Sequence, residues 1–145
     1  MKGRLGGMRG TWDRRRVTAI AIGGAAGAGL RWAVVTSVEA GQFPWPVFAL
    51  NFAGSVLLGV LLAEEWSHPS ARLLLHDVGG IGFCGGLTTF STFSLEVVNL
   101  ARDGDTWFAA IYCVASVAAA IAGVTAGAGA LRRVRAVTLP LEEEP

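Results

Sequence analysis

The sequence predicts an all-α membrane protein that folds as a four-transmembrane-helix bundle. Hydrophobic residues make up 52% of its 145 residues and charged residues only 16%, whereas a soluble domain averages about a quarter charged. Four stretches are apolar and long enough to cross a bilayer core, which needs roughly 20 residues of helix. The links between them are short, so consecutive helices are expected to be antiparallel neighbours.

The first predicted helix spans residues 17–38 and follows a basic N-terminal tail, residues 1–16. It is too long for the apolar region of a signal peptide and three more apolar stretches follow it, so we expect a retained helix. Arg31 lies about two-thirds along it, where a charge is costly. This side chain is expected either to line a polar vestibule or to reach a headgroup or the carbonyls of a helix end.

The second and fourth helices are predicted at 46–63 and 107–131, followed by a C-terminal tail, 132–145. Asn51 sits one turn into the second helix, where its amide either joins helices together or offers N–H donors to a passing ion. Tyr112 and Ser116 lie one turn apart on the fourth helix and begin a polar track that Ala120 interrupts.

The third helix is predicted at 73–100 and contains GFCGGLTTFSTFS at residues 82–94. Adjacent glycines cost roughly 1 kcal/mol each in a helix, so we expect the helix to be broken over Cys84–Thr88. Carbonyls freed by a break must be buried in protein, line a cavity or bind an ion.

Phe90 and Phe93 share a face of this third helix. They are either ordinary packing or a pair of rings whose positive edges solvate a small anion. Glu96 is expected to be a structural or surface-edge carboxylate, or to pair with Arg102 or Arg31.

Small residues recur at four-residue spacing in three helices, as Gly23 and Gly27, Gly82 and Gly86, and Gly123 and Gly127. This spacing lets helix backbones approach closely.

Basic residues are distributed unevenly along the predicted topology. Six lie in the N-terminal tail, one (Arg72) in the middle link and three in the C-terminal tail, whereas the opposite side has only Arg102. The positive-inside rule then places both termini in the cytoplasm of a multi-pass plasma-membrane protein. A net charge of +1 gives no reason to expect a nucleic-acid partner.

The sequence offers no residues for enzyme chemistry. Gly80, Gly82 and Gly85 spell GxGxxG, but that fingerprint requires a preceding strand and a soluble βαβ unit. No nucleophile–base set, P-loop or HExxH motif accompanies it, so the protein is not expected to be an enzyme.

Three stretches resemble motifs of the Fluc (CrcB) fluoride channels. GFCGGLTTFSTFS at 82–94 resembles the family signature, GGAAGAGLRW at 23–32 its first-helix motif and FALNFAGSVLLG at 48–59 its second-helix motif. The resemblance covers about residues 17–131. It implies an antiparallel dual-topology dimer that passively exports fluoride from the cytoplasm down its electrochemical gradient and so protects the cell.

The resemblance also implies roles for individual residues. Fluoride would be solvated by ring edges, an amide and hydroxyls, with Arg31 near the vestibule; the pore set is Arg31, Asn51, Phe90, Ser91, Thr92, Phe93, Tyr112 and Ser116. A structural, untransported sodium ion would be held at the dimer interface by the backbone carbonyls of Gly85 and Thr88 from both subunits. The later hydroxyl positions of the family's fourth-helix track correspond here to Ala120 and Val124.

Three alternatives remain open at the level of sequence. A strong charge bias disfavours insertion in both orientations, so the second antiparallel subunit is either an identical chain or an oppositely biased homologue. A small four-helix drug/proton antiporter would need an embedded carboxylate where the first helix has Arg31. A non-transporting membrane assembly protein would need none of the pore residues.

Overall fold

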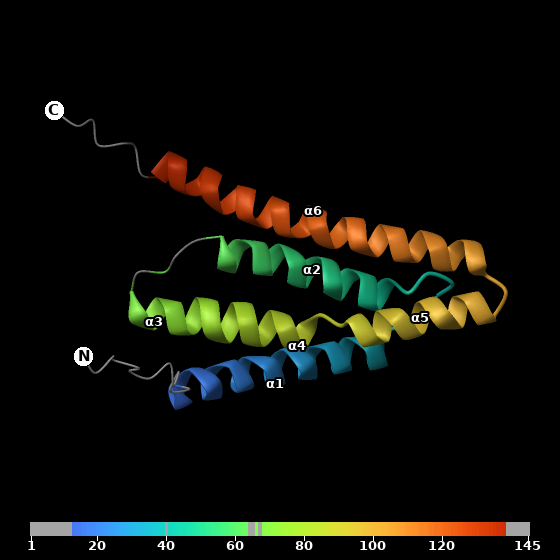
Figure 1. Cartoon of the computed structure of the whole chain (residues 1–145), viewed down its shortest axis with the longest axis horizontal. Helices are drawn as coiled ribbons and strands as arrows, with labels where there is room; N and C mark the ends of the chain where they lie inside the picture. Colours follow the sequence, from blue (N-terminus) through green and yellow to red (C-terminus); the bar gives the residue numbers. More distant parts are fainter. Residues whose placement is uncertain (1–12, 40, 64–65, 67, 139–145) are drawn as a thin grey trace, which may run out of the picture.

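The computed structural model describes residues 13–39, 41–63, 66 and 68–138. Within these ranges every regular element is helical, and four stretches are long and apolar enough to cross a membrane: Arg14–Ser37, Trp45–Leu62, Pro69–Arg102 and Thr106–Ala136. The prediction of an all-α chain with four candidate transmembrane helices is therefore confirmed (Figure 1).

The outer helices extend beyond their predicted limits. Helix α1 (Arg14–Ser37) begins three residues early, because the Asp13 side chain caps it by accepting a hydrogen bond from the Arg15 amide. Helix α6 (Thr106–Thr138) continues seven residues past its predicted end. The rest of both predicted tails, residues 1–12 and 139–145, lies outside the described residues.

The helices do not pack in simple chain order. Helix α1 lies against the third span, and α2 (Trp45–Leu62) lies between the third span and α6 (Figure 1). Contact between α1 and α2 is slight, so the expectation that consecutive helices are neighbours is wrong for this pair. Instead α1 runs parallel to the third span, and α2 runs parallel to α6.

Glycines explain these two parallel pairings. A Cβ added to Gly23 or Gly27 of α1 would overlap the carbonyl oxygen of Val78 or Phe83, respectively. A Cβ added to Gly127 of α6 would overlap the carbonyl oxygen of Val56 in α2. The helices therefore meet backbone to backbone, as the four-residue glycine spacing predicts.

The third span is made of four consecutive pieces. A short helical turn, α3 (Pro69–Ala71), leads into a π-helical stretch, η1 (Arg72–Cys84), and then into α4 (Gly85–Leu87). Thr88 and Thr89 are extended, with ψ of 153° and 127°, and α5 (Phe90–Arg102) follows.

The interruption therefore lies at Thr88 and Thr89, which are the last residue of the predicted Cys84–Thr88 stretch and the one after it. The residues from Cys84 to Leu87 are helical, and Gly86 is pressed against the backbone of Gly24 and Ala28 in α1. Here Gly86 serves close packing, whereas a Cβ on Gly85 would meet nothing within 4 Å, and the two threonines carry the extended backbone.

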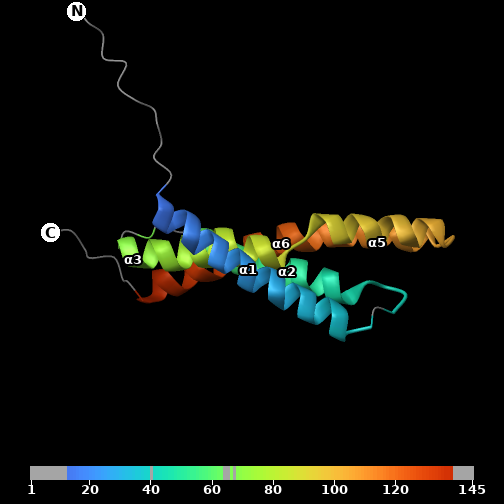
Figure 2. The ribbon, with the colours of Figure 1, turned by 90° about the horizontal axis from the view of Figure 1, so that it is seen from below.

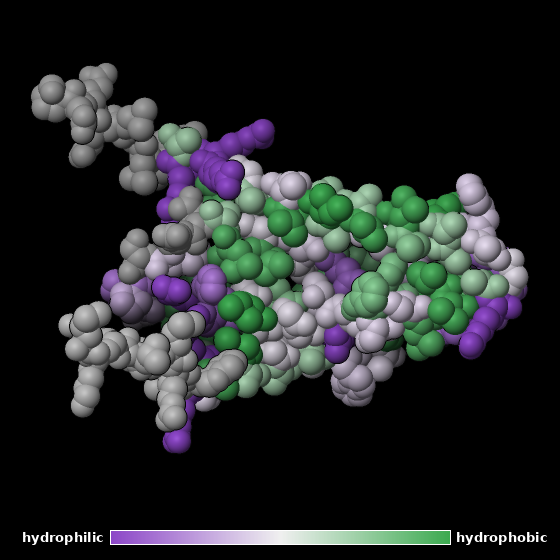
Figure 3. Space-filling view, viewed as in Figure 1, coloured by the Kyte–Doolittle hydropathy of each residue, from purple (hydrophilic) through white to green (hydrophobic). Residues whose placement is uncertain are grey.

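The surface is apolar around the middle of the bundle. Hydrophilic residues gather at the end where α1 begins and α6 ends, with a smaller group at the opposite end (Figure 3). Trp32, Leu74 and Val114 are 63–70% exposed, as expected for side chains facing lipid or another subunit. Seen from below, α1 and α5 diverge past the interruption (Figure 2).

Candidate functional site

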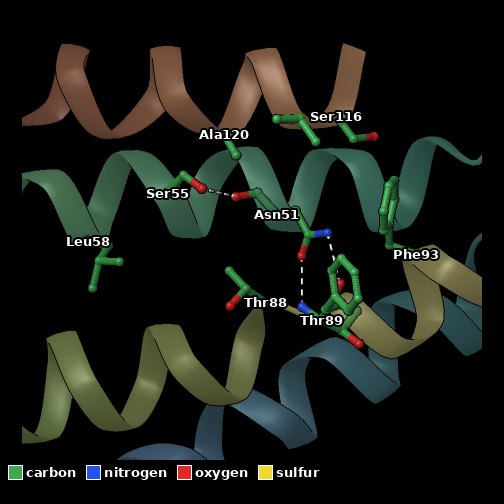
Figure 4. A pocket seen from close by; sticks show the side chains of 10 residues that line it. Asn51, Ser55, Leu58, Thr88, Thr89, Phe93, Ser116 and Ala120 are labelled. Carbon is green, nitrogen blue, oxygen red and sulfur yellow. Dashed lines mark hydrogen bonds between the residues drawn. The ribbon is translucent and has the colours of Figure 1, made fainter. Parts of the chain in front are cut away.

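The extended residues Thr88 and Thr89 are held by Asn51 of α2. The Asn51 Nδ2 donates to the Thr89 carbonyl oxygen at 3.1 Å, and the Thr89 N–H donates to Asn51 Oδ1 at 2.8 Å (Figure 4). A side-chain amide thus makes the two hydrogen bonds that the interrupted helix would otherwise lack. One Asn51 N–H remains available, because the amide nitrogen carries two hydrogens.

Thr89 also starts helix α5. Its hydroxyl accepts from the Thr92 amide at 3.2 Å and lies 3.2 Å from Thr92 Oγ1 and 3.3 Å from Ser91 Oγ. This is an N-cap, which satisfies a donor of the first helical turn. Neither Ser91 nor Thr92 lines the neighbouring cavity, so the structure places these predicted pore residues in the cap.

A cavity of about 270 Å³ lies beside the interruption, between α2, α5 and α6. Its walls combine apolar side chains with neutral polar groups and carry no charged residue; they comprise Asn51, Ser55, Leu58, Thr88, Thr89, Phe90, Phe93, Ser116, Val117 and Ala120. Four of the ten are predicted pore residues, and Thr88 is a predicted sodium ligand.

Ser116 is the unsatisfied polar group of this cavity. Ser116 is 8% exposed, its hydroxyl makes no hydrogen bond within 3.5 Å to any described residue, and it interacts with the Tyr112 hydroxyl only at longer range. Ser55, by contrast, donates to the Asn51 carbonyl at 2.7 Å. A buried hydroxyl without a partner costs about 1–3 kcal/mol, so Ser116 has a donor to offer to a small polar guest.

The two phenylalanines line the same cavity from different environments. Phe93 is 8% exposed and packs against the Tyr112 ring at 5.3 Å, whereas Phe90 is 79% exposed. Their ring centroids lie 5.7 Å apart at an interplanar angle of 43°. Phe93 is therefore part of the core, and Phe90 stands at the outer rim.

Tyr112 is fully buried and does not reach the cavity. Its hydroxyl donates to Glu96 Oε2 at 2.6 Å. Glu96 is therefore a structural carboxylate, which was one of the alternatives expected from the sequence, and its hydrogen-bond partner is Tyr112 of α6 and not Arg102 or Arg31. The two groups of the expected polar track thus differ: Ser116 faces the cavity and Tyr112 faces Glu96.

Arg31 lies behind the interruption and not in the cavity wall. Its Nη1 donates to the Thr88 carbonyl at 3.1 Å, which agrees with the expectation that it bonds carbonyls at a helix end. Gly85 is exposed, and the Thr89 N–H that would normally reach its carbonyl is engaged by Asn51.

Among the described residues near this point, backbone carbonyl oxygens are candidate cation ligands. No cluster of three or more His, Cys, Asp or Glu side chains occurs in the described ranges. The carbonyls of Gly85 and Thr88 suit a hard cation such as sodium, although Thr88 already accepts from Arg31.

Sequence reasoning missed Thr89 and Ser55. A threonine three residues before Thr92 at the start of an amphipathic run is a recognisable N-cap signal. The bond to Asn51 joins residues 38 positions apart, and no local pattern could reveal it.

Comparisons with known proteins identify the family. Residues 18–128 match the family model described as "CrcB-like protein, Camphor Resistance (CrcB)". The chain is 42% identical over 123 residues to "Fluoride-specific ion channel FluC" of Novosphingobium aromaticivorans, covering 79% of this chain and 94% of that protein.

Two further relatives carry corresponding names. "Fluoride-specific ion channel FluC 2" of Nocardia farcinica is 40% identical over 122 residues, which is 83% of this chain and 87% of the relative. "Fluoride-specific ion channel FluC" of Bordetella pertussis is 39% identical over 114 residues, with 79% and 89% covered. Together with the four apolar helices, these matches show that the chain is a multi-pass membrane protein belonging to the CrcB-like family.

Proposed function

We propose that this protein is a fluoride-specific ion channel that passively exports fluoride from the cytoplasm and so limits its toxicity. The relatives' names supply the ion, and membership of the family makes the chain a non-enzymatic transporter. The electrochemical gradient would drive the movement, with no nucleotide required.

The observation that carries the proposal is the buried Ser116 hydroxyl, which makes no short hydrogen bond, in an uncharged cavity. Fluoride is small and strongly hydrated, so a pore must replace its water with hydrogen-bond donors. A channel must also release the ion, which favours neutral donors over a fixed positive charge. Ser116, the free N–H of Asn51 and the ring edges of Phe90 and Phe93 provide such donors.

The remaining predicted residues have supporting roles in this proposal. Thr92 and Ser91 shape the cap of α5 through Thr89. Tyr112 fixes α5 against α6 through Glu96. Arg31 holds the interruption from behind through the Thr88 carbonyl.

A structural sodium ion fits the carbonyls of Gly85 and Thr88, which would hold it where the helix is interrupted. The ion would supply a fixed positive charge that stabilises the freed carbonyls. Arg31 would then share the Thr88 oxygen with it, which has two lone pairs.

The channel is proposed to work as an antiparallel dimer, in which one subunit has both termini in the cytoplasm and the other has them on the opposite side. Phe90 is 79% exposed on the single chain, and a second subunit would cover it. The charge bias favours one orientation for this chain, so the partner is either an identical chain or a homologue of opposite bias.

Fluoride efflux from liposomes containing the full-length protein tests the function. A fluoride electrode would follow release, valinomycin would carry balancing potassium, and chloride would serve as the control ion. Rapid fluoride release without chloride release is expected. Success with this chain alone would establish a homodimer, and success only with a co-expressed homologue would establish a heterodimer.

Matched variants tie the activity to the cavity. Ser116→Ala should lower fluoride efflux about tenfold, since one charge-assisted hydrogen bond is lost. Thr125→Ala is the control, because that hydroxyl lies on the same helix, is exposed and bonds the carbonyls of Ile121 and Ala122. Unchanged efflux in Ser116→Ala would remove the main support for the proposed pore. Proton-coupled drug exchange, or no transport in any assembly, would instead favour the antiporter or assembly protein.

A further inference from the structure

A second cavity lies at the end of the bundle where α1 and α3 begin. Its volume is about 290 Å³, and residues of α1, its cap, α3 and η1 line it. It contains three arginines, Arg15, Arg16 and Arg72, and two carboxylates, Asp13 and Asp77. It shares no residue with the cavity beside Asn51.

The two carboxylates of this cavity are already engaged. Asp77, with a side chain 1% exposed, accepts from Arg16 Nε at 2.7 Å and from Arg16 Nη2 at 2.9 Å. The His76 Nδ1 lies 2.8 Å from Asp77 Oδ1. Asp13 accepts from the Arg15 amide at 3.0 Å as the cap of α1.

Arg15 and Arg72, unlike Arg16, are not engaged by a carboxylate of this cavity. Both are exposed, and neither guanidinium has a hydrogen-bond or ion-pair partner among the described residues. They come from two separate helical elements, yet both line this one cavity. Each guanidinium offers five N–H donors in a planar fork that matches the oxygens of a phosphate group.

The position of the cavity indicates where such a phosphate would come from. Its lining residues belong to the starts of α1, α3 and η1, at the end of the bundle where hydrophilic residues gather (Figure 3). Leu73 lines it and the adjacent Leu74 is 63% exposed. A phosphate bound there would place attached acyl chains along an apolar surface, as in basic pockets that bind lipid head groups.

We propose that the cavity lined by Arg15 and Arg72 binds the phosphate group of an anionic phospholipid. Arg16, fixed by Asp77, and Ser70, which adds a hydroxyl donor, also line this cavity. The site is independent of fluoride conduction, so its test does not depend on the proposed function.

Native mass spectrometry of the full-length protein with added phosphatidylglycerol tests the site. Phosphatidylcholine and inorganic phosphate serve as parallel probes. Wild-type protein should retain phosphatidylglycerol in preference to phosphatidylcholine. The double variant Arg15→Gln/Arg72→Gln should bind phosphatidylglycerol about tenfold more weakly, because two charge-assisted hydrogen-bonding groups are lost.

The matched control is Arg132→Gln/Arg133→Gln, which removes two exposed arginines from α6 at the same end of the bundle. This control should keep wild-type affinity. Arg15→Lys/Arg72→Lys should retain an intermediate affinity, because it preserves charge without the fork. Thermal unfolding without lipid should be the same for all variants, since the substituted side chains have no described partners.

Three results would overturn the proposal. Equal losses in the two Gln variants would show that diffuse charge attracts the lipid. Equal retention of phosphatidylglycerol and phosphatidylcholine by wild-type protein would show no anionic site. Competition by inorganic phosphate at similar affinity would identify a free phosphate as the ligand.

Discussion

The two halves of the third span hold their places by different means. The first half, η1 and α4, packs mainly on α1, and its contacts are made by backbone at Gly82 and Gly86. The second half, α5, packs mainly on α6. There the contact is aromatic, with Phe93 and Tyr112 in a buried cluster with Val47.

The two kinds of contact differ in how large a change of side chain they tolerate. Two backbones in contact leave no room for a side chain, so any larger residue in place of these glycines must push the two helices apart. Aromatic rings can be replaced by smaller side chains at a graded cost. The interruption at Thr88 and Thr89 joins a rigidly placed half to a more adaptable one.

The largest effect is expected at Gly27 of α1. A Cβ there would overlap the Phe83 carbonyl and approach the Leu87 amide at 2.8 Å, so Gly27→Ala should cost about 3 kcal/mol of folding free energy. Gly29→Ala is the control, because nothing lies within 4 Å of its Cβ, and better helix propensity should leave stability equal or slightly higher. Thermal unfolding in detergent measures both. Similar melting temperatures for the two variants would mean that α1 can shift away from the third span. The proposed contrast between a rigid and an adaptable half would then be wrong.

A smaller effect is expected at Phe93 of α5. Phe93→Leu should cost about 2 kcal/mol, because it leaves a gap against Tyr112 in the aromatic cluster. Phe90→Leu should cost almost nothing in the single chain, since Phe90 is 79% exposed. The same unfolding measurement applies. If Phe93→Leu lowered the stability more than Gly27→Ala, the second half of the span would be the less tolerant of the two.

The smallest effect is expected at the Tyr112 hydroxyl. Tyr112→Phe removes its 2.6 Å hydrogen bond to Glu96 and should cost about 1 kcal/mol. In a double-mutant cycle, Tyr112→Phe in a Glu96→Ala background should cost much less, since the partner is already absent. Equal costs in both backgrounds would show that the hydrogen bond adds nothing to the aromatic contact.

The sequence predicts some levels of this structure better than others. The four helices follow from the length of apolar stretches, and the glycine faces follow from spacing. The parallel pairing of α1 with the third span could not be predicted in this way. Link lengths limit which helices can be neighbours, but the shapes of the helix surfaces determine which of the possible neighbours pack together.

The same limit applies to the candidate site. Asn51, Phe90, Phe93 and Ser116 are conspicuous as residues and do line one cavity. Their partners are not conspicuous, since Asn51 bonds a residue 38 positions away and Arg16 bonds Asp77 across 61 positions. Tertiary contacts of this kind depend on the whole packing arrangement and leave no local pattern.

The slight contact between α1 and α2 has a consequence for how the protein is made. The packing partner of α1 is η1, which begins at Arg72, well after α1 ends at Ser37. At roughly 5–20 residues per second during synthesis, α1 waits on the order of seconds in the bilayer before its glycine face is covered. During that time lipid tails, or the insertion machinery, must occupy the groove that the third span later fills.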